Sequence, residues 1–215
     1  MPNWITNKVS APKEVLQSLI NEEGRIDFNT LIPFTGSFQW CGIDSAAEKC
    51  AEVITLAPLN DNPLIASLQH SNRQDANALK LSDEQFDQFV QMLRNKRETG
   101  YFHSLDFAND QWGTKWNACN QAPCIDVDVL EFDTAWSCPQ PIYKALSAKH
   151  PDAEINVRFA DEDLGSNCGT LTFRAGQLTS SDVAPNWDGL SLEERKRWED
   201  FAYELTGRSR DDEEE

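Results

Sequence analysis

The sequence predicts an α+β fold: a ferredoxin-like, mostly antiparallel sheet with helices on one face, plus a helical insertion and a C-terminal helix. Strand-like alternation of apolar and polar residues occurs near both ends of the chain, and helical periodicity dominates its middle. Local hairpins beside helices are typical of this fold class.

Four segments show the alternation of a strand, and they are Trp4–Ser10, Ile125–Asp133, Glu154–Ala160 and Gly169–Ala175. In the second segment, Asp126 and Asp128 are expected on the same side of the sheet, about 7 Å apart. A metal or general-acid pair is conceivable there, but alternation alone places acids on a solvated face, which is the interpretation we favour.

Helix signals fill the remaining chain. Ser10 and Pro12 predict the start of a helix, and this helix is expected to end near Gly24. Another helix is expected over Asp44–Leu56. Capping boxes predict helices after Ser82 and after Ser191. Ser137 is expected to cap a further helix that ends at Pro151, whereas the polar segment Pro58–Lys80 predicts a surface loop with at most one short helix.

These elements predict three parts along the chain. Residues 1–178 form a single ferredoxin-like domain with a helical insertion at about 41–110. Residues 179–208 are a linker and an amphipathic C-terminal helix, and residues 209–215 are a disordered acidic tail.

The net charge of −17 excludes some classes of partner. The tail Asp211–Glu215 carries five of these charges, so the rest of the chain still carries −12. Such an excess repels nucleic-acid phosphates and argues against direct binding to nucleic acid. It is compatible with a partner protein that has a basic surface, or with solubility alone. The first residues carry no apolar signal segment, so we expect a cytoplasmic protein without a membrane association.

Six cysteines are expected to be reduced, because a chain of this length without a secretion signal does not need disulfides. Cys119 and Cys124, with Cys138 further along, could gather a zinc ion, but their spacing matches no usual structural site. We therefore predict neither a metal nor a cofactor.

Tryptophans concentrate between Gln111 and Ser137, which holds three of the seven in the chain. These rings could wall a ligand pocket that also contains one cation and one carboxylate. The candidate binding residues of such a pocket are Trp112, Lys115, Trp116, Asp133 and Trp136. The favoured alternative is that the tryptophans are core and that Gly113 permits a tight turn between them. No phosphate loop, nucleophile elbow or paired histidine and carboxylate accompanies them, so no catalytic residue is predicted.

Five motifs occur in order along the chain: Met1-Pro2-Asn3-Trp4 with Asn7; Ile26-Asp27-Phe28-Asn29 with Ile32-Pro33; Trp112-Gly113-Thr114-Lys115-Trp116; Phe132-Asp133-Thr134-Ala135-Trp136-Ser137 with Pro139 and Pro141; and a final hairpin with Gly169 and Gly176. Together they resemble the YubB-like, or Api-like, family, which is encoded by phages and plasmids and carries a ferredoxin-like domain. The resemblance covers most of residues 1–178 and implies that fold and an origin in a mobile genetic element. It departs from the family pattern at Ile5, at Cys138, in the 58–80 segment and in the C-terminal helix. No activity is assigned to the family, so the resemblance implies none.

Two functions remain open. The first is a non-enzymatic accessory protein, in the cytoplasm of a host cell, that binds and inhibits a host protein with a basic surface. Its target would be a nucleic-acid-handling defence component, bound by charge mimicry of DNA. The expected acidic surface consists of Asp126, Asp128, Asp161, Glu162 and Asp163. The second is an enzyme that binds a small molecule or nucleotide around Lys115 and Asp133. RNA binding through the sheet ranks last, because the strands present acids rather than exposed aromatics.

Overall fold

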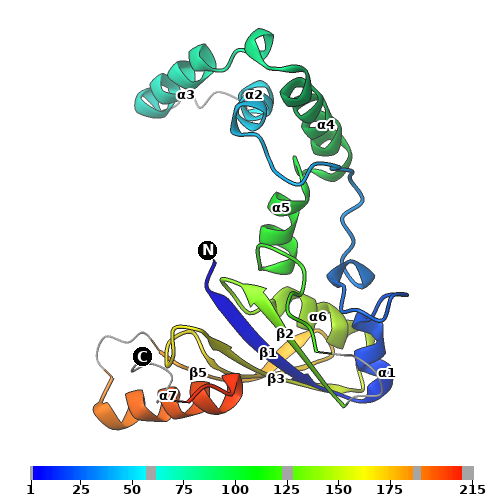
Figure 1. The fold of residues 1–215 in the computed structure, drawn as a ribbon, viewed down its shortest axis with the longest axis vertical. Coiled ribbons are helices and arrows are strands. Elements are labelled where there is room, and N and C mark those ends of the chain that lie inside the picture. Colours follow the sequence, from blue (N-terminus) through cyan, green and yellow to red (C-terminus); the bar gives the residue numbers. More distant parts are fainter. Residues whose placement is uncertain (1, 57–61, 123–127, 186–189, 210–215) are drawn as a thin grey trace. The chain divides into compact units, whose positions relative to one another are not determined.

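The computed structural model describes residues 2–56, 62–122, 128–185 and 190–209. The chain divides into two compact units, each of which is described by itself (Figure 1). Unit 1 comprises residues 1–33 and 108–215, and unit 2 comprises residues 34–107. The predicted insertion at about 41–110 overlaps unit 2.

Unit 1 is built on a five-stranded sheet in which every neighbouring pair is antiparallel. Its strands are β1 (Trp4–Ser10), β2 (Val129–Ala135), β3 (Glu154–Asp161), β4 (Gly169–Arg174) and β5 (Gln177–Val183), in the spatial order β2-β1-β3-β4-β5. Because β2 and β3 both run antiparallel to β1, they are parallel to each other with β1 between them. The helix α6 (Gln140–Lys149) connects them, which gives the split β-α-β unit of a ferredoxin-like sheet. The predicted α+β class is confirmed.

One face of this sheet packs against α6. The rings of Tyr143 on α6 and Phe173 on β4 lie 5.9 Å apart, and both side chains are fully buried. The Tyr143 hydroxyl donates to Oδ1 of the buried Asn7 at 3.0 Å, while Asn7 Nδ2 donates to the Ile5 carbonyl and to Thr134 Oγ1. The polar groups at the centre of this core are therefore satisfied, as burial requires.

The opposite face packs against α7 (Leu192–Thr206), which lies below the sheet in Figure 1. Trp198, Ala202 and Leu205 of this helix form a buried cluster with Ala160 and Cys168. The predicted capping box is confirmed, because Ser191 accepts from the Glu194 N–H and Glu194 accepts from the Ser191 N–H. The C-terminal helix thus docks on its own sheet.

Unit 2 is helical. Its elements are α2 (Ser45–Thr55), α3 (Pro63–Asp75), the 3₁₀ turn η3 (Ala78–Lys80), α4 (Asp83–Thr99) and α5 (Ser104–Phe107). Its buried core combines small residues of α2 with larger ones of α4 and beyond: Ala47, Cys50, Ala51, Phe89, Met92 and Phe102. The predicted Ser82 capping box is confirmed, and Gly100 ends α4 in the left-handed conformation. None of the helices in the described ranges is long and apolar enough to cross a membrane.

Unit 1 also holds shorter helical pieces, which connect β1 to unit 2 and unit 2 back to β2. They are α1 (Lys13–Leu16), the 3₁₀ turns η1 (Gln17–Leu19) and η2 (Phe28–Thr30), and the π-helical turn η4 (Ala108–Trp112). The first helix ends earlier than the prediction, so Gly24 does not cap it but lies in a separate turn with φ +75°.

Three further predictions are wrong in detail. Residues 179–183, expected in a linker, belong to β5, whose residues are all exposed, so this edge strand has no apolar alternation to reveal it. The 58–80 segment contains the 13-residue helix α3, whose second half, residues 69–75, is entirely polar and shows no apolar periodicity. Neither Ser10 nor Ser137 caps a helix, because Pro12 and Pro139 occupy the capping positions. For the predicted strand 125–133, residues 125–127 lie outside the described residues.

Candidate functional site

Strand pairing in unit 1 brings the start of β1 together with the ends of β2 and β3. Trp4 pairs with Ala135, and Ile5 pairs with Asp161. The loop that follows η4 is bonded to the end of β2, because Thr114 Oγ1 donates to the Ala135 carbonyl at 2.9 Å. We call this region the sheet end and define it by Trp4, Lys115, Trp116, Trp136 and the turn 161–167.

Trp116 and Trp4 lie together at the sheet end. Their ring centroids are 6.0 Å apart with an angle of 43° between the planes. The Lys115 ammonium lies 4.8 Å from the centroid of the Trp116 ring, a cation–π geometry. Trp116 remains 38% exposed, so this packing leaves part of its ring available to a partner.

Trp136 follows directly after β2 and has an unusual backbone. Its φ of +70° lies in the left-handed region, which costs a bulky L-residue about 1 kcal/mol or more. Its N–H donates to the Asn3 carbonyl at 2.9 Å, and its carbonyl accepts from Asn167 Nδ2 at 3.5 Å. The side chain is 51% exposed. The turn therefore holds the backbone firmly while presenting the indole to solvent.

Further hydrogen bonds lock the same turn. Thr134 Oγ1 donates to the Ser137 carbonyl at 2.8 Å, and the Ser137 hydroxyl donates to the Gly113 carbonyl. Ser137, predicted as a helix cap, thus serves instead to join the turn to the loop after η4. Gly113 has φ +71°, and a Cβ there would meet the Pro141 ring at 3.0 Å, so the predicted need for glycine at this tight turn is confirmed.

Trp112 is a core residue. It is 5% exposed, its indole N–H donates to the Ile32 carbonyl at 2.8 Å, and its ring meets Phe28 edge-on at 5.6 Å. For this tryptophan the structure supports the core interpretation rather than the pocket. Of the five predicted binding residues, Trp112 is therefore the one that packing already explains.

The Asp133 carboxylate accepts hydrogen bonds from two other parts of unit 1. Thr6 Oγ1 donates to one of its carboxylate oxygens at 3.1 Å, and Asn120 Nδ2 donates to the other at 2.9 Å. In addition, Cys119 pairs with Asp133 in an isolated bridge. The carboxylate thus connects β1 and the segment around Asn120 to β2, a structural use for a group predicted as a possible acid or base.

The predicted acidic surface is only partly a surface. Asp161 is 5% exposed and accepts hydrogen bonds from Asn3, from the Asp163 N–H and from Asn167, at 3.4, 3.0 and 2.9 Å. Its burial corrects the expectation that it lies on the surface, and it organises the turn beside Trp136. Glu162 and Asp163 are exposed.

The other two predicted surface acids are Asp126 and Asp128, of which the structure describes only Asp128. Asp128 is exposed, with its carboxylate 3.9 Å from the Lys13 ammonium. Asp126 lies outside the described residues.

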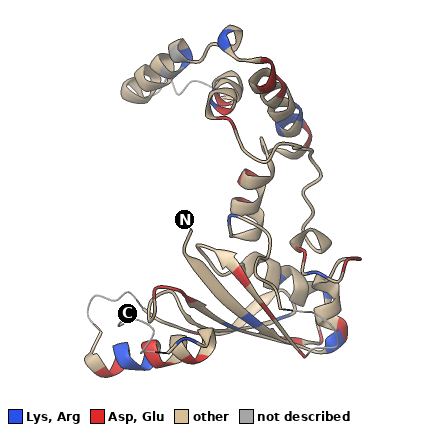
Figure 2. Ribbon diagram, in the orientation of Figure 1, with Lys and Arg blue, Asp and Glu red and all other residues tan. Residues whose placement is uncertain are grey.

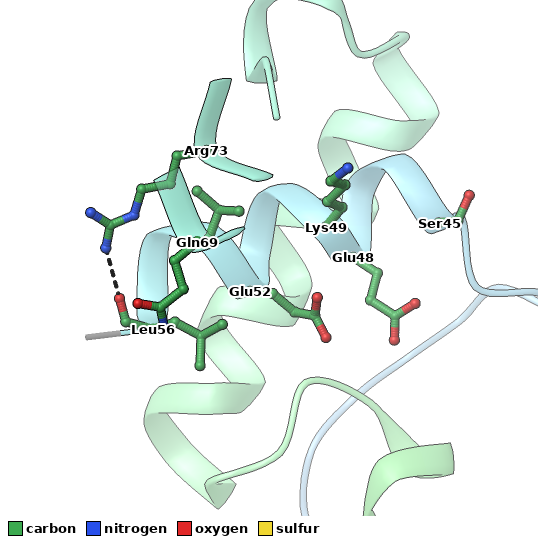
Figure 3. Close-up of a pocket in the computed structure, with 8 residues that line it drawn as sticks. Ser45, Glu48, Lys49, Glu52, Leu56, Gln69 and Arg73 are labelled. Carbon is green, nitrogen blue, oxygen red and sulfur yellow. Dashed lines mark hydrogen bonds between the residues drawn. The ribbon is translucent and has the colours of Figure 1, made fainter. Parts of the chain in front are cut away.

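A pocket of about 210 Å³ lies in unit 2 between α2 and α3 (Figure 3). The Glu48 and Glu52 carboxylates extend from α2, and the Arg73 guanidinium donates to the Leu56 carbonyl at 3.1 Å. Ser45, Lys49, Val53 and Gln69 complete the lining. Burial raises the pKa of the Glu52 carboxyl, and the nearby carboxylates of Glu48 and Asp106 raise it further against the opposing effect of His103. No sequence motif indicated this pocket.

Glu48, His103 and Asp106 offer the types of ligand atom that hold a metal, within 4.8 Å of one another. His103 Nε2 lies 3.0 Å from Glu48, while its Nδ1 accepts the Asp106 N–H at 3.2 Å. This assigns the ring proton to Nε2, which donates to Glu48. Metal-bound histidine has the reverse pattern, in which the second nitrogen donates a proton. The bonding therefore favours a structural role for His103, joining α2 to α5.

The described cysteines are free thiols. Burial raises the pKa of Cys168 to about 12, with a contribution from Asp161, and burial also raises the pKa values of Cys119 and Cys138. Such thiols stay protonated at neutral pH and are poor nucleophiles and ligands. Cys124, the third member of the conceivable zinc set, lies outside the described residues.

Sequence reasoning missed two members of the sheet end. The sequence places Trp4 in a strand and in the first motif but not beside Trp116, which lies 112 positions later in the chain. Asp161 looked like one more surface acid, since its three donors come from a distant asparagine and from its own turn. The contacts of Trp4 with Trp116 and of Asp161 with Asn3 join positions more than a hundred apart, so no local pattern shows them.

Comparison with known proteins gives the class of domain. Residues 111–202 match the family model described as the ferredoxin-like domain in Api92-like protein. This finding supports a relationship between the chain and Api92-like proteins and agrees with the fold of unit 1. A crystal structure of a protein Api92 from Yersinia pseudotuberculosis matches with 11% identity and a TM-score of 0.40, covering 86% of this chain and 99% of that one. None of the curated proteins matches the chain.

Proposed function

We propose that this chain is a non-enzymatic binding protein whose partner is a protein with a basic surface. The observation that carries the proposal is the sheet end, where the Trp4–Trp116 ring pair and the exposed Trp136 lie on segments bonded to the acidic turn 161–167. Partly exposed tryptophans are the side chains that most often dominate protein interfaces. Adjacent carboxylates suit lysine and arginine side chains of a partner.

The charge of the chain supports the same class of partner. Several basic side chains of unit 1 already face acids: Lys8 lies 3.2 Å from Glu131, and Arg158 lies 2.9 Å from Glu204. Figure 2 shows basic and acidic residues mixed along α7 in the same way. The excess of acids thus remains after these pairs have formed, and a net negative field increases the association rate with a basic partner.

The finer parts of the proposal concern origin and target. We include an origin in a phage or plasmid, which the motif resemblance supports. We also include inhibition of a host component that handles nucleic acid, in which carboxylates take the place of DNA phosphates. The acidic charge supports this second part, since a DNA-binding groove is a basic surface. The alternative of a nucleotide-binding enzyme around Lys115 and Asp133 stays a prediction, because no further observation at these residues adds to it.

A capture experiment tests the proposal. The protein is immobilised and exposed to host lysate at about 50 mM salt, and bound proteins are eluted in steps up to about 500 mM, a range over which exposed charge attractions are strongly screened. We expect a small set of basic proteins to be retained at low salt and released as salt rises.

The Trp116→Ala variant is compared with the wild type, because it keeps the net charge of the protein but removes one partly exposed ring. It should retain less of the same proteins. Retention of nothing at low salt, or equal retention by both proteins at every salt concentration, would contradict the proposal.

A further inference from the structure

Trp136 carries two costs that the fold does not require. Its backbone is in the left-handed region at φ +70°, where glycine or asparagine is the usual residue, and half of its large apolar surface faces solvent. Strained residues that a structure holds firmly are concentrated at sites of recognition. Both costs point to a use for this indole outside the folded chain.

The indole has no partner that would make it structural. Within the described ranges, its ring has no aromatic or cationic neighbour, in contrast to Trp116, which contacts Trp4 and Lys115. The hydrogen bonds that Trp136 itself makes in the turn all involve its backbone atoms, through Asn3 and Asn167. A residue without a side chain could make the same bonds.

The acidic turn 161–163 lies next to the backbone of Trp136. The Glu162 N–H donates to the Trp4 carbonyl at 2.9 Å, and Asn167 bridges the Trp136 carbonyl to the buried Asp161. Asp163 is exposed in the same turn and contacts Ser166, at 3.0 Å. Arg208 donates to the backbone carbonyl of Glu162 at 2.8 Å. In the part of the chain that the structure describes, the Glu162 carboxylate has neither a hydrogen bond nor an ion pair.

An exposed indole whose backbone is linked to a turn with exposed carboxylates matches one side chain in particular. A guanidinium group stacks on an aromatic face and simultaneously donates paired hydrogen bonds to a carboxylate, whereas an ammonium group is a point charge without a flat face. Lysine can satisfy only part of this arrangement.

We propose that Trp136 is a binding residue that stacks on an arginine side chain of an arginine-rich segment of the partner, with Glu162 and Asp163 accepting from its guanidinium. This inference rests on the proposed function and specifies the site and the chemistry of the contact. The strained turn after β2 fixes the backbone from which the indole projects, which reduces the entropy lost on binding.

The test uses the full chain and a fluorescein-labelled peptide of nine arginines, with binding followed by fluorescence anisotropy. Trp136→Gly removes the ring and relieves the backbone strain. We expect it to weaken binding at least tenfold while its melting temperature stays the same or rises. Trp136→Phe, which keeps an aromatic face, should lose much less. A nine-lysine peptide should bind the wild type more weakly than the arginine peptide.

Ala175→Gly is the matched control, since Ala175 also has a positive φ, of 49°, and lies in the β4–β5 turn. It should not change peptide binding. A Trp136→Gly protein that binds as the wild type does, or one that melts several degrees lower, would overturn the inference and leave the proposed function standing. Tighter binding of the lysine peptide or of a single-stranded oligonucleotide, or no binding of any probe, would also overturn the arginine contact. The lysate capture tests the proposed function independently of this result.

Discussion

At the residue scale, Asp27 shows how one carboxylate joins distant parts of unit 1. Its Oδ1 accepts from the Asn29 N–H, which caps the turn η2, and from the Asn117 side chain at 2.7 Å. Partial burial raises the pKa of the Asp27 carboxyl, but the hydrogen bonds from Asn117 and Asn29 outweigh that effect and leave the pKa below its ordinary value of 3.8. The charged form is therefore the one that the fold stabilises.

We expect Asp27→Ala to lower the free energy of unfolding by about 1 to 2 kcal/mol at pH 7, because it removes a cap and a partly buried hydrogen bond. The pKa is lowered in the folded state, so this stabilisation is complete above pH 3.8 and is lost as the pH falls through the folded pKa. Urea unfolding at pH 7 and at pH 3 measures the difference. Glu22→Ala, at an exposed position, is the control, and a gap between wild type and Asp27→Ala that widens at pH 3 would contradict the explanation.

The buried polar groups of unit 1 follow the same logic. Asn7 is fully buried, yet each of its side-chain groups has a partner on β2, α6 or its own strand. The alternation of β1 predicts that position 7 faces inward, but an asparagine there is explained only by Tyr143 and Thr134, which the fold brings to it. A polar residue in a core is interpretable only with its partners.

At the element scale, α7 illustrates how a helix start can be predicted and its docking cannot. The capping box at Ser191 gives the start of the helix, and its apolar stripe predicts that one face is buried. The sequence left open whether the sheet or a partner covers that face. The structure decides for the sheet, through contacts with Ala160 and Cys168.

Leu205→Ala should therefore lower the free energy of unfolding by about 2 to 5 kcal/mol, the usual range for truncating a buried leucine. Leu205 is 1% exposed, whereas Leu192 in the same helix is 82% exposed and supplies a matched control whose change to alanine should cost almost nothing. Denaturant unfolding measures both variants. Equal losses in the two proteins would contradict docking of α7 on the sheet.

The edge strand β5 is an element that the sequence pattern did not predict. β5 is fully exposed along its length, and its pairing with β4 consists of backbone hydrogen bonds that no side-chain pattern encodes. β3 and β4 instead alternate because one face of each meets the α6 side, so their positions were predicted almost residue by residue. Periodicity reveals a strand only where burial imposes it.

At the scale of the whole molecule, the negative charge is unevenly shared. Unit 2 has ten acidic and six basic residues, a net −4, and the remaining −13 of the total of −17 belongs to unit 1. The unit that carries the sheet end is thus also the unit with the stronger field. Charge attraction and the aromatic contact would then act on the same partner.

We expect the association rate with the nine-arginine peptide to fall about tenfold between about 50 and 500 mM salt, since steering by charge is screened. Deleting residues 211–215 reduces the net charge to −12 and should lower the rate at low salt, with a smaller effect on dissociation. Stopped-flow fluorescence measures both rates. An association rate that does not depend on salt would exclude steering and leave only the contact at Trp136.

The sequence by itself determined the α+β class, the interior strands, the capped helices, the charge and the presence of an important tryptophan-rich stretch. Each of these depends on local periodicity, on capping residues or on a sum over the chain. Only the tertiary structure decided which tryptophans are core and which are exposed. It placed Trp112 against Phe28, brought Trp4 to Trp116, buried Asp161 and left Trp136 strained and open. The sheet end arises from antiparallel pairing between residues more than a hundred positions apart, and Trp112 meets Phe28 from 84 positions away in the chain, so no local pattern contains either arrangement.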